Sequence, residues 1–323
     1  MIRRRALTAA PWLLPGLAAA QDAPWPNKPV RILLAYPPGG STDVLARALA
    51  EALGHAIPGS SFVVENRPGG AAVVGTQAAA TAAPDGYTLS LGNNQTHAAN
   101  AAMVRDLPYR PIEDFAPIGR LAEVHHALVV PANSPARRLA ELAARGKGGG
   151  RLTYASSGVG SASHVIAESF VRREGLEATH VPYRGGAQAT TDTVGGVVDF
   201  FVSTWPQVMT LVKEGRLRGL GIGAPARLPE FPDVPSFAEA GAPYMAVDAW
   251  FGLWAPARTP APVIHRLSEA LPKILAEPGM AARLATLGFT PAPLPAAEFA
   301  AFQRAEVERW QALVALTGIR LDG

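Results

Sequence analysis

The sequence predicts an α/β fold built from two lobes, and three features of the chain support this prediction. Strand-like and helix-like segments alternate, which is typical of a mainly parallel sheet covered by helices. This alternation occurs in two separate units. Two extended, apolar, proline-flanked stretches, 125–135 and 249–262, could be strands that cross between the units and form a hinge. We therefore expect one lobe from 27–124 plus 252–323 and a second lobe from 125–251.

The first lobe is expected to begin in βαβαβ order and to end in two helices. The predicted elements are strands at 30–36, 61–66 and 87–93, and helices at 43–53, 261–275 and 296–316. The helix at 43–53 rests on one apolar stripe of valine, leucine and alanine, and Gly54 is a natural end for it. Asp43 and Arg47 lie one helical turn apart, so we expect them to pair.

The second lobe is expected to repeat this order. The sequence predicts a strand followed by a loop within 152–158, a strand followed by a turn within 178–186, and a strand at 198–203. It predicts helices at 161–175 and 187–196. The chain has 323 residues, of which 48% are hydrophobic and 17% are charged. This length suggests about two domains, each with enough apolar residues for a core of its own.

The N-terminus has the layout of a secretory signal peptide. Three arginines, 3–5, precede an apolar stretch at 6–17, and small residues at Ala18 and Ala20 suggest cleavage after Ala20. The apolar stretch is too short for a membrane-spanning helix of about 20 residues. We expect residues 1–20 to be a signal peptide and the mature chain to be periplasmic. The arginine pair leaves the general and the twin-arginine export routes open.

Removal of the signal peptide would change the net charge. The full chain has 29 basic and 26 acidic residues, a net charge of +3, and loss of the three arginines leaves 26 of each. No basic patch with interleaved aromatic residues is present, so nucleic acid is not an expected partner. The chain contains no cysteine, which excludes a lipoprotein anchor and a disulfide framework. We expect a free monomer without a membrane anchor.

Two loops that lead from a predicted strand into a predicted helix are candidate binding elements. They are PPGGSTD at 37–43 and SSGVGSASH at 156–164. In an open parallel sheet, ligands lie outside the carboxyl ends of the strands. A helix start has unpartnered N–H groups and about half a positive charge, so two starts across a cleft would bind an anion such as a carboxylate. Either loop alone could be a tight turn, but their matching positions favour a binding pair.

Other chemistries have less support. The GVGSAS stretch at 158–163 lacks the third glycine of a dinucleotide-binding loop, so no cofactor is expected. His164 and Glu168 lie one helical turn apart, and without a third ligand we expect local hydrogen bonding rather than a metal site. Ser161 and His164 could touch, but no orienting acid is evident for a catalytic triad. We therefore expect a binding protein rather than an enzyme.

Ordered blocks along the chain carry a resemblance to a known family. The longest are at 25–47 and 63–89, and shorter ones include LTYASSGVGSASH, VPYRGG, VDFFVS and GRLRGLGIG. From 29 to about 319 the chain resembles the substrate-binding proteins of tripartite tricarboxylate transporters, the Bug family. The resemblance implies the two-lobed periplasmic binding protein architecture of type II. It also implies a receptor that captures a small organic carboxylate in the cleft and delivers it to a two-component membrane permease.

The resemblance further implies a set of ligand-binding positions. The first loop contributes Pro38, Gly39, Gly40, Ser41 and Thr42, and the second contributes Ser156, Gly158, Gly160, Ser161 and His164. The remaining positions are Thr96, His97, Arg184, Gly185, Asp199, Ser203 and Trp205.

Three residues depart from the family pattern. Ala101 replaces a usual proline, Arg184 stands where lysine is common, and Trp205 stands where a small residue is frequent. Trp205 could face a ring-bearing ligand, but packing is favoured because indole mostly serves as buried area. Arg184 could pair with a second carboxylate or could lie on the surface beside a turn.

Two alternative functions stay open. The chain could be the ligand-binding subunit of a signalling membrane protein, since the same cleft would serve that purpose. A secreted hydrolase that uses Ser161 and His164 is less well supported, because the third member of a triad is missing. The identity of the carboxylate is not predicted.

Overall fold

The first strand of lobe 1 is β1 (Val30–Leu34), and it is largely buried. Val30, Ile32 and Leu34 are fully buried and Leu33 is nearly so, which is typical of a strand covered on both faces.

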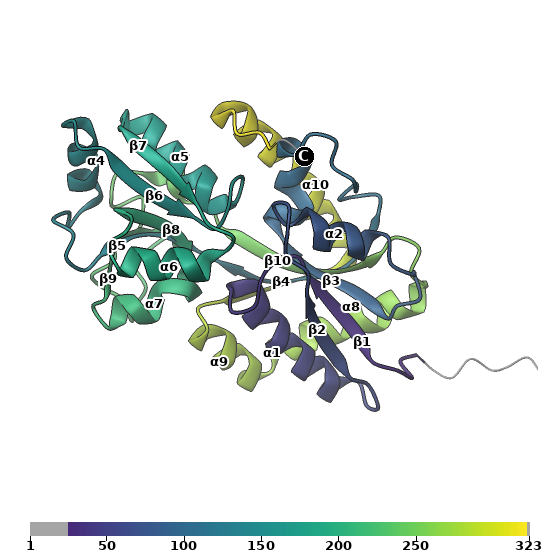
Figure 1. Ribbon diagram of the computed structural model, residues 1–323. Helices are drawn as coiled ribbons and strands as arrows, with labels where there is room; N and C mark the ends of the chain where they lie inside the picture. Colours follow the sequence, from purple (N-terminus) through teal and green to yellow (C-terminus); the bar gives the residue numbers. More distant parts are fainter. Residues whose placement is uncertain (1–24, 322–323) are drawn as a thin grey trace, which may run out of the picture.

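The computed structural model describes residues 25–321, and Figure 1 shows two lobes side by side. The predicted signal peptide lies outside the described residues. Within 25–321, every helix is too short or too polar to cross a membrane.

The lobe 1 sheet has six strands in the order β11-β4-β10-β3-β1-β2. Its strands are β1, β2 (Phe62–Asn66), β3 (Thr88–Asn93), β4 (Phe115–Val124), β10 (Ala249–Pro256) and β11 (Thr290–Pro295). Strand β1 pairs in parallel with β2 and β3, whereas β10 is antiparallel to β3 and β4, and β11 is antiparallel to β4. The expectation of a mainly parallel sheet is therefore wrong here. The sheet is mixed because the chain returns from lobe 2 along β10.

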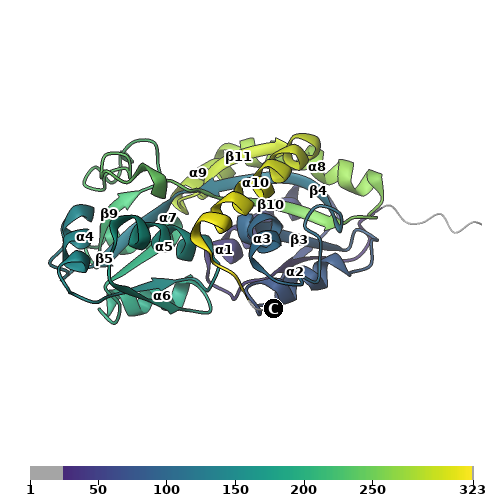
Figure 2. The same ribbon diagram turned by 90° about the horizontal axis from the view of Figure 1, so that it is seen from above.

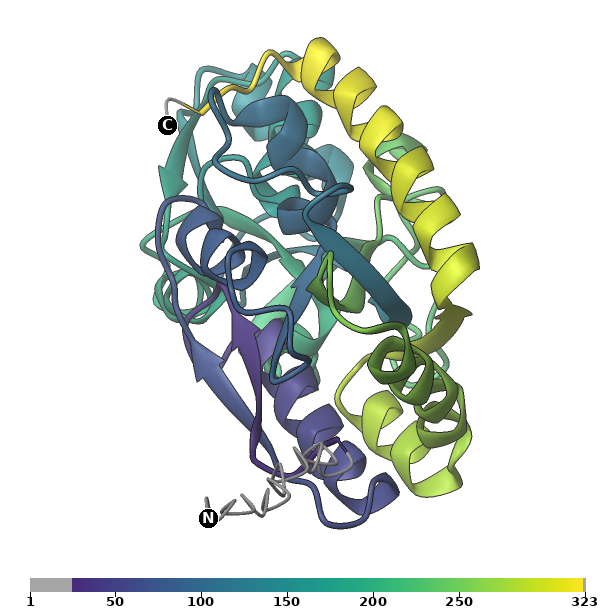
Figure 3. The same cartoon turned by 90° about the vertical axis from the view of Figure 1, so that its right-hand side faces the viewer.

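Helices cover this sheet on both faces. They are α1 (Ser41–Ala56), α2 (Val73–Ala80), α3 (Asn100–Met103), α8 (Ala261–Ala276), α9 (Pro278–Thr286) and α10 (Ala296–Thr317), with a π-helix, η1 (Gln95–Ala99), before α3. The sequence predicted α1, α8 and α10 but missed α9 and β11, which lie between α8 and α10 in the chain. Figure 3 shows α10 as a long helix along the outside of the molecule.

The lobe 2 sheet has five strands in the order β7-β6-β8-β5-β9. Its strands are β5 (His126–Pro131), β6 (Leu152–Ser156), β7 (Ala178–Pro182), β8 (Phe200–Thr204) and β9 (Leu217–Ile222). Its helices are α4 (Leu139–Lys147), α5 (Ala162–Glu174), α6 (Gly186–Val194) and α7 (Trp205–Lys213), with a short 3₁₀ helix, η2 (Pro243–Met245). Strand β6 is parallel to β7 and β8, whereas β5 is antiparallel to β8 and β9. This sheet is also mixed.

The chain passes between the two sheets at His125, between β4 and β5, and returns before β10. The His125 ring lies 2.8 Å from the carboxylate of Asp248, so the two crossings are joined side by side. The C-terminal segment makes a further connection. Leu321 pairs with Val104 of lobe 1, and its side chain packs against Gly160 of lobe 2. Figure 2 shows α10 above the junction of the lobes.

Candidate functional site

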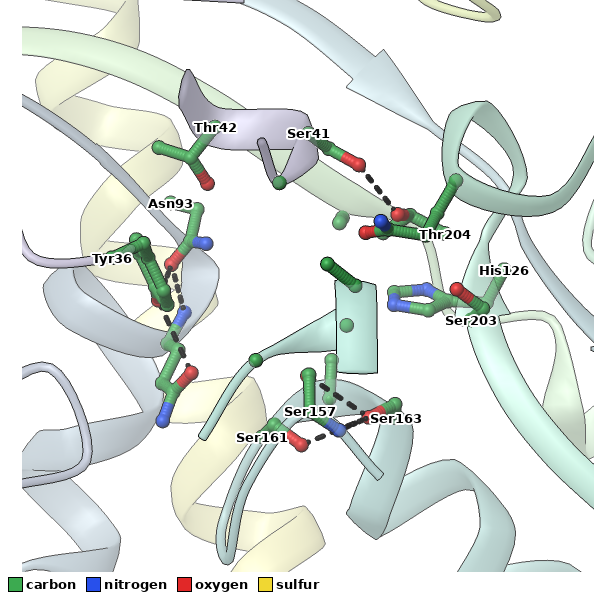
Figure 4. Close-up of a pocket in the computed structure, with 18 of the residues that line it drawn as sticks. Tyr36, Ser41, Thr42, Asn93, His126, Ser157, Ser161, Ser163, Ser203 and Thr204 are labelled. Atoms are coloured by element: carbon green, nitrogen blue, oxygen red, sulfur yellow. Dashed lines mark hydrogen bonds between the residues drawn. The ribbon is translucent and has the colours of Figure 1, made fainter. Parts of the chain in front are cut away.

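A small cavity lies between the lobes, at the carboxyl ends of β1, β3, β6 and β8. Its volume is about 90 Å³, and we call it the inner cavity. Figure 4 shows the side chains around it. Lobe 1 contributes Tyr36, Pro37, Pro38, Gly40, Ser41, Thr42, Asn93, Asn94, Gln95, Ala249 and Phe251. Lobe 2 contributes His126, Ser157, Ser161, Ala162, Ser163, Gly185, Gly186, Ala187, Phe201, Ser203, Thr204 and Gln207.

The N-terminus of α1 forms one wall of the inner cavity. Gly40 is the N-cap residue and no side chain caps the first turn, in which Ser41 and Thr42 line the cavity. A helix start of this kind presents N–H groups and about half a positive charge. The wall therefore favours a negatively charged ligand group.

Asp43 fixes the loop in front of α1. Its carboxylate accepts hydrogen bonds from the Gly39 N–H at 3.1 Å, from Arg47 at 2.9 Å and from the Asn66 amide at 2.9 Å. Burial pushes the pKa of Asp43 up, but these hydrogen bonds and the Arg47 charge outweigh burial and hold the pKa below its ordinary value. The predicted pairing of Asp43 with Arg47 is confirmed. The carboxylate is thus paired with groups of lobe 1 from the loop, from α1 and from the end of β2.

The start of α5 forms the facing wall with three serine hydroxyls. Ser161 is the N-cap residue: its hydroxyl accepts from the His164 N–H at 3.2 Å and donates to the Gly158 carbonyl at 2.7 Å. The Ser163 hydroxyl lies 2.9 Å from that of Ser161 and accepts from the Ser157 N–H at 2.9 Å. This network fixes the serines, and Figure 4 shows the three side chains together.

The end of β3 brings three amide side chains to the cavity, Asn93, Asn94 and Gln95. The side-chain oxygen of Asn93, Oδ1, accepts from the Tyr36 hydroxyl at 2.8 Å and from the Gln95 backbone N–H at 3.0 Å. Asn94 is 2% exposed, and its amide nitrogen has no hydrogen-bond partner among the described residues. A buried donor without a partner costs about 1–3 kcal/mol, so a ligand acceptor at this point would remove that cost.

His126 lines the cavity from β5. Its Nδ1 lies 2.8 Å from the Val247 carbonyl oxygen, so Nδ1 is the protonated donor and Nε2 is the free acceptor of the neutral ring. Burial lowers the pKa of His126 more than the Val247 carbonyl and the Asp248 charge raise it. The ring is therefore neutral near pH 7, and the inner cavity has no charged side chain in its lining.

The two lobes touch at the rim of the inner cavity. The Ser41 hydroxyl lies 2.7 Å from that of Thr204. On the other side, Gly185 comes so close to Pro37 that a Cβ on the glycine would lie 3.0 Å from the proline Cγ. The described conformation is thus a closed one.

A family model described as the tripartite tricarboxylate transporter family receptor matches residues 44–319. The chain belongs to this family. Among curated relatives, BugT of Bordetella pertussis is 34% identical over 309 residues, which cover 95% of this chain and 94% of BugT.

Three solved structures resemble this receptor over nearly their whole length. The periplasmic binding protein BugD has a TM-score of 0.86 at 29% identity and covers 92% of this chain and 99% of its own. An R. palustris protein solved with adipate has a TM-score of 0.87 at 31% identity, with the same coverage. MatC from Rhodopseudomonas palustris with bound malate has a TM-score of 0.83 at 31% identity and covers 90% of this chain and 100% of its own. The predicted periplasmic binding protein architecture is confirmed.

Nine of the predicted site residues line one of two cavities. Pro38, Gly40, Ser41, Thr42, Ser161, Gly185 and Ser203 line the inner cavity. Gly158 and Arg184 line a second, larger cavity that adjoins it. The eight others lie elsewhere, for the reasons that follow.

Thr96 and His97 line neither cavity, because they turn into the core of lobe 1. The His97 ring is fully buried and stacks on Trp254, with 3.6 Å between ring centroids, and its Nδ1 lies 2.9 Å from the Thr96 hydroxyl. Burial lowers the pKa of His97 to about 3. The sequence prediction chose these two residues and missed Asn93, Asn94 and Gln95 just before them. The available signal was a run of three amides at the carboxyl end of a buried strand.

In the second loop, Ser156 and His164 line neither cavity; they pack behind the serine wall at the start of α5. The His164 ring stacks on His180, with 3.8 Å between centroids, and its Nδ1 accepts from the Gly160 N–H at 3.1 Å. The Ser156 hydroxyl lies 2.6 Å from Nε2 of His180. Since His164 contacts Ser161 through its backbone N–H, its ring does not activate that serine. This geometry gives no support to the hydrolase hypothesis.

The last four predicted residues serve the loops and the lobe 2 core. Gly39 orients the first loop through Asp43, and Gly160 packs against Met103 and Leu321. Asp199 accepts from the Thr153 N–H at 2.8 Å, away from both cavities. Trp205 is buried and meets the Phe231 ring edge-to-face, with 4.7 Å between centroids, as the packing interpretation expected.

Proposed function

We propose that this protein is a periplasmic receptor that captures a small organic carboxylate in the inner cavity and delivers it to a two-component membrane permease. The observation that carries the proposal is the Asn94 amide, a buried donor without a partner among the described residues. It lines the same cavity as the uncapped start of α1 and the serine hydroxyls of α5. A carboxylate can accept from all three groups at once.

Neutral donors are sufficient to hold such an anion. A hydrogen bond to a charged group contributes about 1.5–3 kcal/mol net. Three or four of them approach the roughly 8 kcal/mol that corresponds to micromolar affinity. A receptor that must release its ligand gains from this arrangement, since no buried arginine has to lose its counterion on release.

The relatives support the class of ligand and the cellular role. Two similar proteins were solved with adipate and with malate, which are both dicarboxylates. The family description names a tripartite tricarboxylate transporter, which supports a permease as the partner. The arginine-rich N-terminal stretch supports export to the periplasm.

Isothermal titration of the mature chain with a panel that includes adipate and malate tests the binding site. We expect one-to-one binding of a carboxylate without turnover. Asn94→Ala should weaken it by about 10- to 150-fold, the equivalent of 1.5–3 kcal/mol. Asn133→Ala, at an exposed loop position of lobe 2, is the matched control and should bind as the wild type does. Absence of binding to every carboxylate, or full affinity in Asn94→Ala, would refute the proposal.

Uptake in cells tests the permease partner. Cells that lack this receptor should lose uptake of the radiolabelled ligand, and re-expression of the wild type should restore it. Asn94→Ala should restore it only at higher ligand concentration. Unchanged uptake in the deletion strain, with ligand binding intact in vitro, would favour a signalling partner instead.

A further inference from the structure

His126, in β5, is a buried polar side chain that lines the inner cavity. It is 2% exposed, and Figure 4 shows its ring directed toward the other side chains around the cavity. Within residues 25–321 the ring makes one hydrogen bond, from Nδ1 to the Val247 carbonyl oxygen at 2.8 Å. Nε2 has no hydrogen-bond partner there, and it is also not among the polar atoms that neighbouring atoms enclose completely. Nε2 is therefore open to the cavity.

This open nitrogen can only accept a hydrogen bond. A carbonyl oxygen has no proton to donate, so the proton of the neutral ring is on Nδ1 and Nε2 carries a lone pair. The backbone holds the ring in this place: β5 pairs with β8 and β9, and the Gly223 N–H donates to the His126 carbonyl oxygen at 2.7 Å. The acceptor is thus positioned by the fold before any ligand binds.

A simple carboxylate does not satisfy Nε2. Both oxygens of an ionised carboxylate are acceptors, so they suit the start of α1 and the Asn94 amide, which are donors. A ligand without a donor would displace water from Nε2 and leave a buried acceptor unpaired, which is unfavourable. The cavity therefore favours a ligand that carries a hydrogen-bond donor in addition to its carboxylate.

A hydroxyl is the donor that suits this lining. The described residues that line the inner cavity include no carboxylate side chain, and the starts of α1 and α5 each carry a partial positive charge. An ammonium group would enter this environment without a counterion from the protein, whereas a hydroxyl is neutral. The cavity has a volume of only about 90 Å³, so the hydroxyl and the carboxylate must lie close together on the ligand.

We propose that His126 is a specificity-determining residue, which accepts a hydrogen bond from a ligand hydroxyl on the carbon next to the carboxylate or on the following carbon. The receptor would then select hydroxycarboxylates over the matching acids without a hydroxyl. This proposal rests on the proposed function, in which the carboxylate occupies the inner cavity. A hydroxy acid exchanges a water contact at Nε2 for a ligand contact, whereas the unsubstituted acid leaves Nε2 unpaired.

Matched acids that share a carbon skeleton test this selection by isothermal titration. One set is lactate, 2-fluoropropionate, propionate and alanine; a second is malate, fluorosuccinate, succinate and aspartate; a third is 3-hydroxybutyrate and butyrate. We expect the hydroxy acid to bind about tenfold more tightly than the unsubstituted acid. The fluoro acid should bind no better than the unsubstituted acid, because fluorine is similar in size to a hydroxyl but is not a donor. The amino acid should bind more weakly than the hydroxy acid.

His126→Phe tests the residue itself. The variant keeps a ring of similar shape and removes Nε2, so the affinity ratio between the hydroxy acid and the unsubstituted acid should fall to about one. His97→Phe is the matched control, since His97 is also a buried histidine but lines neither cavity. This control should keep the tenfold ratio. Melting temperatures of both variants show whether they are folded.

Nitrogen NMR of the wild type gives a readout that needs no variant. The ¹⁵N chemical shift of Nε2 should be that of an unprotonated nitrogen in a neutral ring. In the complex with the hydroxy acid, this shift should lie closer to the protonated value than in the complex with the unsubstituted acid, because Nε2 then accepts a hydrogen bond. Equal shifts in the two complexes, or a proton on Nε2 in the free protein, would contradict the proposal.

The outcomes separate this proposal from the proposed function. Equal affinity for hydroxy and unsubstituted acids, tighter binding of the amino acid than of the hydroxy acid, or an unchanged ratio in folded His126→Phe would overturn the role of His126. In each of these cases carboxylate binding persists, and the proposed function stands. If only larger acids bind, the hydroxy and unsubstituted acids of that skeleton are compared in the same way. Only a failure of every carboxylate would remove both proposals.

Discussion

The hydroxyl of Ser41, in the first turn of α1, lies 2.7 Å from the hydroxyl of Thr204, at the end of β8. This hydrogen bond joins the lobes directly at the rim of the inner cavity. It can exist only while the cleft is closed. The pair therefore links the closed state to ligand retention.

Removal of this bond should speed ligand release. Ser41→Ala and Thr204→Val should each raise the dissociation rate by about fivefold, because a neutral hydrogen bond contributes about 1 kcal/mol net. Stopped-flow measurements on the single and double variants form a cycle in which the two effects are not additive. Ser60→Ala, which removes a bond to Ile57 within lobe 1, is the control and should leave the rate unchanged. Additive effects at 41 and 204 would show that the bond does not form in solution.

Gly185 should be essential for closure and dispensable for folding. Its φ of 171° is ordinary extended backbone, so a side chain brings no backbone strain. A Cβ would, however, lie 3.0 Å from Cγ of Pro37 in the opposite lobe. Gly185→Val should therefore leave the melting temperature of the free protein near that of the wild type and weaken ligand binding by more than about tenfold.

Small-angle scattering provides the direct test of closure in Gly185→Val. The wild type should become more compact when ligand is added, and the variant should not. Gly279→Val is the control, because a Cβ at this position in α9 meets no other atom within 4 Å. Full compaction of the Gly185 variant would contradict the prediction.

Gly39 and Gly40 are neighbours, yet their substitutions should have different effects. Gly40 has an ordinary φ of −83° and lines the inner cavity, so Gly40→Val should abolish binding and keep the fold. Gly39 has a φ of +84° but open space around it, so Gly39→Ala should cost about 1 kcal/mol of stability through backbone strain. Its ligand affinity should change little. Titration and chemical unfolding of both variants measure this contrast.

The stacked His164 and His180 should make the protein sensitive to acid. Burial is the largest cause that lowers both pKa values, that of His164 to about 4, and the charge of His180 lowers it further. Histidine has its ordinary pKa of 6.5 in the unfolded chain, so acid protonates the unfolded state first. The contribution of this pair to the free energy of unfolding should therefore be constant above about pH 6.5 and fall as the pH drops toward 4.

Urea unfolding across this pH range tests the role of the pair. His164→Gln should unfold with a shallower pH dependence than the wild type, since one of the buried rings no longer titrates. His97 and His126 retain their lowered pKa values, so the dependence should not vanish. His55→Gln, at an exposed position of α1, should follow the wild-type curve. An equal slope in His164→Gln would disprove the assignment.

The two loops were predictable because strand ends and helix starts leave local marks in a sequence. Glycine and serine after an apolar run predicted both walls, and Ser41 and Ser161 indeed line the inner cavity. Asn94 was not predicted, because the sequence does not show that its amide nitrogen is buried without a hydrogen-bond partner. That can be seen only in the structure. His97 was misplaced for a related reason: its stacking partner, Trp254, lies in a strand far along the chain.

The sheet topology was only partly predictable. Local alternation identified β1, β2 and β3 but could not tell that β10 would return between β3 and β4 in the opposite direction. Strand β11 was missed because its sequence, TPAPLP, has three prolines and reads as a loop. It occupies the edge of the sheet, where a residue without an N–H is tolerated.

The position of Leu321 has a practical consequence. This residue pairs with Val104 and packs on Gly160, and it lines the second, larger cavity beside the inner cavity. An affinity tag or fluorescent protein attached directly after Leu321 would therefore begin at the larger cavity. An attachment before Trp25 is better placed, because Trp25 packs near Tyr87 and Arg266 and lines neither cavity. In a biosensor this position is an advantage. Leu321 contacts both lobes, so a dye attached beside it would report on their opening.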